Sequence, residues 1–109
     1  HIYMPSYIPE GYRLADLHNY NNIAIIQYVN DEGESLFFEQ CSEGQSNLRV
    51  DTENAESSKV KINKKEMEIF VVDKNGVTAL VWHDNEILFT LVGPLDKNEL
   101  IKMAESMTE

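Results

Sequence analysis

Cysteine is nearly absent from this chain, which has Cys41 alone among its 109 residues. A single cysteine excludes a disulfide within the chain and a metal site built on several thiolates. The five glycines form neither a GxGxxG motif nor a P-loop, so the sequence predicts no phosphate-binding loop and no cofactor. No apolar run approaches the roughly 18 residues of a membrane-spanning helix, and no signal peptide opens the chain.

Basic residues are scarce as well. Nine Lys and Arg stand against 19 Asp and Glu, which gives a formal net charge of −10. The densest group of lysines, within residues 59–65, is surrounded by glutamates. Nucleic acids and anionic membrane surfaces require a basic face, so the sequence excludes both as partners. We expect the negative charge to keep the domain soluble.

The remaining composition is that of a globular protein. The chain is 42% hydrophobic and 26% charged, within the ordinary range for a folded domain. A chain of this length buries enough surface for one hydrophobic core but not for two. The sequence therefore predicts a single domain over residues 1–109.

The N-terminal half predicts an extended arm followed by a hairpin. Two prolines and a glycine within residues 4–11 prevent a regular helix there, and Tyr7, Ile8 and Tyr12 are expected to lie against the sheet that follows. A strand-like pattern begins at Tyr12. The apolar runs 23–29 and 36–41 flank a turn cluster at residues 30–33, where Gly33 supplies a positive φ.

The C-terminal half reads as a meander that ends in a helix. Short apolar runs separated by turn residues predict strands at 60–62, 67–72, 77–82 and 87–92, with turns at 63–65, 73–76 and 83–85. The Asn75-Gly76 pair favours a type I′ turn.

A helix is predicted over residues 96–107. Asp96 and Glu99 have the spacing of a capping box, and an apolar stripe follows: Leu100, Ile101, Ala104 and Met107. The predicted fold is α+β: an antiparallel meander of about six or seven strands with one C-terminal helix packed across it.

A long polar excursion, residues 42–58, separates the two halves. It exceeds ordinary loop lengths, and loops of this length are usually functional or mobile, so it is the first place to look for function. A short strand is expected at 48–50. Asp51, Glu53 and Glu56 could offer oxygen ligands to calcium, but the segment lacks the central glycine and terminal glutamate of an EF-hand, which favours a solvated loop.

Candidate catalytic residues do not form a recognisable constellation. His1, His18 and His83 are scattered along the chain, and His83 is best explained as part of a hairpin tip. A nucleophilic Cys41 would need His18 or His83 nearby to lower its pKa, whereas a buried strand cysteine is the more common case. The sequence predicts no catalytic residue and no metal ligand.

Aromatic residues are the more suggestive group. Phe38, Trp82 and Phe89 could line a concave sheet face, and together with Asp51 and Glu53 they form the candidate ligand or partner surface. The alternative for the three rings is ordinary core packing.

Several segments resemble one known family, the domain of unknown function numbered 4367. They are YIPEGY at 7–12, YVNDEG at 28–33, FEQ at 38–40, DTENA at 51–55, LVW at 80–82 and LIKMAES at 100–106. Members of that family look like the extracytoplasmic C-terminal part of longer proteins, found mainly in Gram-positive bacteria. A transmembrane segment, sometimes with an anti-sigma-like cytoplasmic region, often precedes this part.

The resemblance implies that this chain is the outer, cell-surface domain of a membrane-anchored protein, separated from its anchor. A first residue of His1 in place of Met agrees with that expectation. The family brings no catalytic residues to carry over.

These observations support three hypotheses. The first is a non-enzymatic binding or sensing module that presents its sheet face or the excursion to an unknown protein or small ligand. The second is a carrier that holds an apolar ligand in a cavity between sheet and helix, which close packing would remove. The third is a small hydrolase that uses clustered carboxylates, which would need those groups to meet in a cleft.

Overall fold

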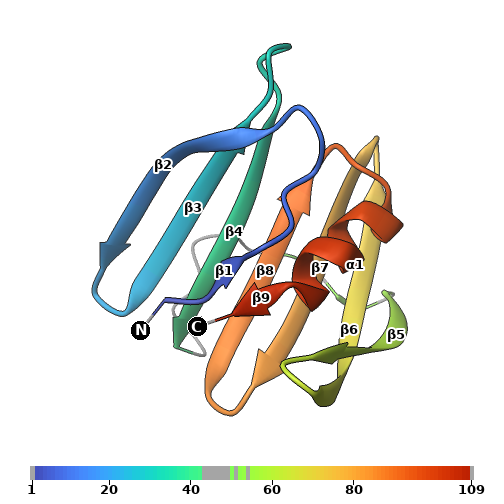
Figure 1. Cartoon of the computed structure of the whole chain (residues 1–109). Helices are drawn as coiled ribbons and strands as arrows, with labels where there is room; N and C mark the ends of the chain where they lie inside the picture. The colour runs from blue at the N-terminus through green and yellow to red at the C-terminus, as the bar shows by residue number, and fades with distance from the viewer. Residues whose placement is uncertain (1, 43–49, 51, 54, 109) are drawn as a thin grey trace.

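The computed structural model describes residues 2–42, 50, 52–53 and 55–108. Within them the chain forms nine strands and one helix (Figure 1). In chain order these are β1 Met4–Pro5, β2 Arg13–Tyr20, β3 Ile23–Val29, β4 Ser35–Ser42, β5 Glu56–Ile62, β6 Lys65–Lys74, β7 Val77–Asp84, β8 Ile87–Gly93, α1 Lys97–Glu105 and β9 Met107–Thr108.

Seven of the strands form one antiparallel sheet in the order β2-β3-β4-β8-β7-β6-β5. Two meanders, β2 to β4 and β5 to β8, meet where their last strands pair. The remaining strands, β1 and β9, pair with each other and lie with α1 in front of one face of the sheet (Figure 1). The predicted α+β class and the predicted helix across the sheet are confirmed.

The core lies between the sheet and α1. Each of the five central strands contributes one residue to a row that runs across the sheet, and neighbours in this row are directly paired: Ile26, Phe38, Leu91, Leu80 and Val71. All five are at most 4% exposed. Thr78, Leu80 and Trp82 share this face, as alternation along β7 predicts.

Asparagine begins each of the four two-residue turns of the sheet. Asn21, Asn63, Asn75 and Asn85 have φ between 50 and 59°. The left-handed region is tolerated by Asn. In three of these turns the second residue also has positive φ, as a type I′ turn requires, and such turns match the twist of the strands: Asn22, Lys64 and Gly76. Gly33, with φ of 80°, closes the longer β3–β4 connection, as predicted.

The structure changes the bounds of some predicted elements and leaves one predicted strand largely untested. The hairpin tip at residues 83–85 lies further along the chain, because His83 and Asp84 belong to β7 and the turn begins at Asn85. The polar excursion ends before Glu56, where β5 begins. The strand predicted at 48–50 lies outside the described residues except for Val50, which is not in a strand.

The helix begins as the sequence predicts and ends earlier. Asp96 is the N-cap, and its Oδ1 accepts from the Glu99 amide at 3.1 Å. The Glu99 carboxylate does not complete a capping box in the contacts described, since its Oε1 accepts from the Tyr7 hydroxyl at 2.6 Å. Met107 belongs to β9, and Met103 is buried in the helix stripe together with Leu100 and Ala104.

The N-terminal arm is fastened to the end of the helix. Backbone amides of Ser6 and Tyr7 donate to the carbonyl oxygen and to Oγ of Ser106, at 3.1 and 3.0 Å. The Lys102 ammonium lies 5.4 Å from the centre of the Tyr7 ring. The contacts of Tyr7 are therefore with the C-terminal helix, where the sequence predicted the sheet. Ile8 was also expected to lie against the sheet and is 37% exposed.

Gly93 is tightly enclosed, and this generates a stability prediction. A Cβ atom placed on Gly93 would lie 2.3 Å from Cδ1 of the fully buried Leu36. We expect Gly93→Ala to lower the free energy of unfolding by about 1–3 kcal/mol, because Leu36 must move inside a packed core. Urea denaturation measures the loss.

The double variant with Leu36→Val is the control for this mechanism. Because the shorter side chain makes room for the new methyl group, the double variant should lose less stability than the sum of the single variants. If Gly93→Ala were as stable as the unaltered domain, Leu36 would not prevent a side chain at position 93.

Candidate functional site

The three aromatic residues of the candidate surface lie in the interior. Phe38, Trp82 and Phe89 are at most 3% exposed. Their rings stack, with centroids 6.2 Å apart for Phe38 and Trp82, 6.0 Å for Phe38 and Phe89, and 5.3 Å for Trp82 and Phe89. Tyr3 of the arm packs edge-on against Phe89 at 5.4 Å. These rings therefore form part of the packed core between sheet and helix.

Side chains of α1 fill the space above this aromatic cluster. Leu100, Met103 and Ala104 are fully buried against it. The buried Tyr28 hydroxyl has no hydrogen-bond partner among the described residues. Burial also raises the pKa of Tyr28.

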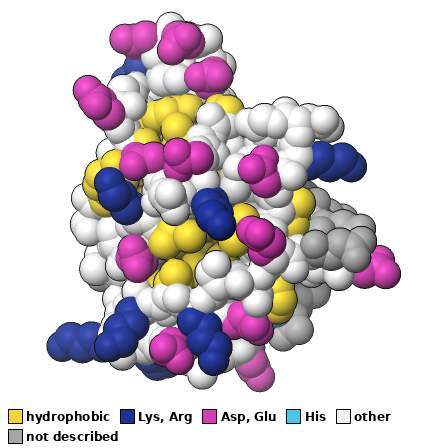
Figure 2. All heavy atoms as spheres, turned by 90° about the vertical axis from the view of Figure 1, so that its right-hand side faces the viewer, with side chains coloured by type: hydrophobic (Ala, Val, Ile, Leu, Met, Phe, Trp, Pro, Cys, Tyr) yellow, Lys and Arg dark blue, Asp and Glu magenta, His cyan; other side chains and the backbone are white. Residues whose placement is uncertain are grey.

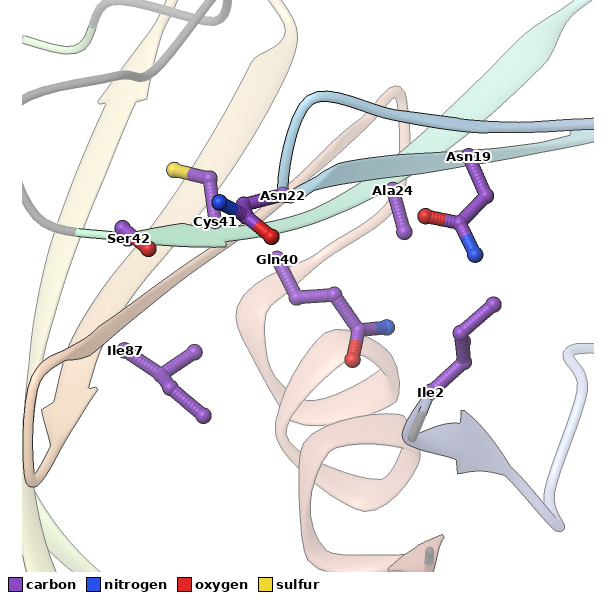
Figure 3. A pocket seen from close by; sticks show the side chains of 8 residues that line it. All are labelled: Ile2, Asn19, Asn22, Ala24, Gln40, Cys41, Ser42 and Ile87. Atoms are coloured by element: carbon purple, nitrogen blue, oxygen red, sulfur yellow. The ribbon is translucent and has the colours of Figure 1, made fainter.

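A hollow of about 330 Å³ lies at one end of the sheet, between Ile2, which precedes β1, and the strands β2, β3, β4 and β8 (Figure 3). It is lined by Ile2, Asn19, Asn22, Ala24, Gln40, Cys41, Ser42 and Ile87. The Gln40 amide points toward the helix side and is already bonded to the arm: it accepts from the Tyr3 amide at 2.7 Å and donates to the Tyr3 carbonyl at 2.8 Å. Gln40 thus positions the arm.

Cys41 points to the other side of the sheet from Gln40 (Figure 3). Leu88 lies between Cys41 and His83 in the sheet register, so two strand spacings, about 9–10 Å, separate their backbones. His18 is on the edge strand β2, opposite Ile25. Burial, and to a smaller extent the charge of Glu39, raises the pKa of the Cys41 thiol.

Of the two acidic residues of the candidate surface, the structure describes Glu53 alone. Asp51 lies outside the described residues, and Glu53 is exposed in a turn. Glu56 Oε1 lies 3.5 Å from Lys97 Nζ. Among the described residues, no group of three or more His, Cys, Asp and Glu side chains is placed to hold a metal ion.

A second hollow, of about 380 Å³, is formed by the ends of β6 and β7. Its lining is largely charged and includes Lys65, Glu66, Glu68 and His83. Lys65 Nζ lies 3.2 Å from Asp84 Oδ1 across it. Figure 2 shows the side of the molecule that carries β5 and β6, where cationic and acidic side chains lie among one another.

The opposite edge of the sheet has a different surface. All eight residues of β2 are exposed, and three of them are large and apolar: Leu14, Leu17 and Tyr20. Among the described residues β2 pairs only with β3 and forms one edge of the sheet (Figure 1). An exposed edge strand with apolar side chains is a ready template for another polypeptide strand.

Sequence reasoning did not single out β2. Its apolar residues are spaced by three positions, so they do not alternate as a strand pattern requires. The pairing shows the reason, because the register shifts between Leu14 and Asp16 at a β-bulge. The shift puts Leu14 and Leu17 on the helix side of the sheet, opposite Tyr28 and Ile26.

The environment of Cys41 predicts its reactivity. We expect iodoacetamide to alkylate the folded domain at pH 8 about tenfold or more slowly than the urea-unfolded chain, since a buried thiol with a raised pKa forms little thiolate. The folded-state rate should still be rising above pH 9.0, the ordinary pKa of the thiol. Equal rates in both states would contradict this placement.

No helix in the described part of the chain has the length and apolar character needed to cross a membrane. In comparisons with known proteins, no curated protein and no solved structure matches this chain. A family model does match, over residues 2–107. That match covers nearly the whole chain, and the chain therefore belongs to the family described as domain of unknown function DUF4367.

Proposed function

We propose that this domain is a binding or sensing module without catalytic activity, carried on the outer face of the membrane by an anchored parent protein. The observation that carries the binding role is the exposed edge strand β2 with its apolar side chains Leu14, Leu17 and Tyr20. The proposed location is supported by the resemblance of the sequence segments to a family whose members look extracytoplasmic.

An edge strand recognises a partner mainly through its backbone. Strand addition supplies main-chain hydrogen bonds for affinity, and side chains on alternate positions supply specificity. At β2 the amide of Leu17 donates to its neighbour Asp16 Oδ1 at 2.9 Å, a local contact that a pairing strand would replace. The exposed Leu17 side chain lies beside this amide and gives the added strand an apolar contact.

The filled interior supports binding at the outside of the domain over carriage of a ligand within it. An apolar carrier needs an empty space, whereas here stacked rings and the buried side chains of α1 occupy the region between sheet and helix. A hydrolase with clustered carboxylates has less support, because Glu53 is exposed and Glu56 is paired with Lys97.

The location can be tested with Val77→Cys in the full-length protein. Val77 is 44% exposed at a hairpin end, so the new thiol should react with a membrane-impermeant maleimide in intact cells. The unaltered protein is the control, since its Cys41 is buried. Labelling that appears only after the cells are broken would show that the domain lies inside.

The binding role can be tested with a photoreactive amino acid at position 17 of the full-length protein in its own cells. We expect one defined crosslinked product from Leu17 on the β2 edge and none from the matched position 77, which is also apolar and exposed. The proposal fails if neither position crosslinks or if both give the same products.

A further inference from the structure

The two edges of the sheet are protected to different degrees. On β5, the exposed residues Lys59 and Lys61 place charge along the edge, a common device against strand-to-strand association. The edge at β2 has no lysine. It has a bulge between Leu14 and Asp16, and its two charged residues, Arg13 and Asp16, each lie beside a polar partner. Residues 16–20 beyond the bulge pair regularly with β3 and form an edge without lysine or proline.

β2 also has one charged residue of each sign, Arg13 and Asp16, in a chain whose net charge is −10. Arg13 Nη1 lies 2.9 Å from Asp31 Oδ1, and His18 Nε2 lies 2.8 Å from Asp16 Oδ2. Because β2 has no excess of acidic residues, it repels a second copy of this negatively charged chain less than the rest of the surface does.

The sequence of this edge is complementary to itself. In an antiparallel pair, directly opposed residues lie on the same face. A register centred on Leu17 sets Leu17 opposite Leu17 of the second copy and Asp16 opposite its His18. The neighbouring register, centred on His18, would instead set two histidines opposite each other and Leu17 opposite Asn19. Of these two registers, the one centred on Leu17 brings two leucines together and sets an acidic side chain opposite a histidine.

We propose that β2 is a homodimer interface, in which two copies of this chain pair their β2 strands antiparallel about Leu17. The arrangement has two-fold symmetry and joins both sheets into one. The contact is short, so it falls below the roughly 1,200 Å² at the low end of specific interfaces, and the dimer is weak and concentration-dependent. It rests on the proposed function in one respect: two copies anchored in one membrane have the raised effective concentration that a weak contact needs.

Sedimentation of the purified domain over a concentration series tests this pairing. We expect the average mass to rise toward that of two chains, and to rise further with added NaCl, which screens the repulsion between acidic copies. Leu17→Asp should weaken association about tenfold or more, as like charges meet at the two-fold axis. The matched control is Val77→Asp, which changes a similarly exposed apolar residue outside β2 and should have no effect.

A crosslink provides a second measurement that does not depend on a destabilised variant. Under mild oxidation Leu17→Cys should give a covalent dimer, whereas Val77→Cys should remain monomeric. A domain that stays monomeric at the highest concentration and forms no Leu17→Cys crosslink overturns the proposal, as does equal weakening by the two aspartate variants. In the cellular crosslinking experiment, a product at position 17 with a mass other than two parent chains would also overturn it, while leaving the binding role intact.

Discussion

The pairing of β4 with β8 is the contact on which the rest of the structure depends. It runs from Phe37 opposite Val92 to Ser42 opposite Ile87 and joins the two meanders into one sheet. It also sets Phe38 beside Leu91 and Gln40 beside Phe89, which brings the aromatic rings of both halves into one stack. Without it each meander would end in a further open edge, and the apolar row across the sheet would be divided.

This pairing is also the feature least visible in the sequence. Its strands are separated by more than forty residues, and long-range pairings of this kind leave no local pattern. The local elements were predictable because their causes are local. Alternation placed Leu80 and Trp82 on one face, Asp96 capped the helix, and Asn75-Gly76 formed the expected turn. The turn at Asn63 was predicted as well, whereas the turn at Asn21 was not, because no glycine follows it.

The candidate surface was less predictable than the fold for a physical reason. Large aromatic residues are the ones that folding buries most strongly, so composition alone cannot separate a ligand groove from a core. Phe38, Trp82 and Phe89 lie in that core. The roles proposed for Asp51 and Glu53 stay predictions. By contrast, β2 is exposed because it lies at the edge of the sheet, and only topology reveals an edge.

The contact between β1 and β9 has a mechanical consequence. Met4 lies opposite Thr108 and Pro5 opposite Met107, so the two ends of the described chain leave this small ladder on the same side. A force that pulls those ends apart acts on the hydrogen bonds between β1 and β9 one at a time. The pair therefore separates at a low force. The arm would therefore peel away from the end of the helix while the seven-stranded sheet stays intact. Tension on this domain would first uncover Gln40 and Phe89, which Tyr3 of the arm contacts.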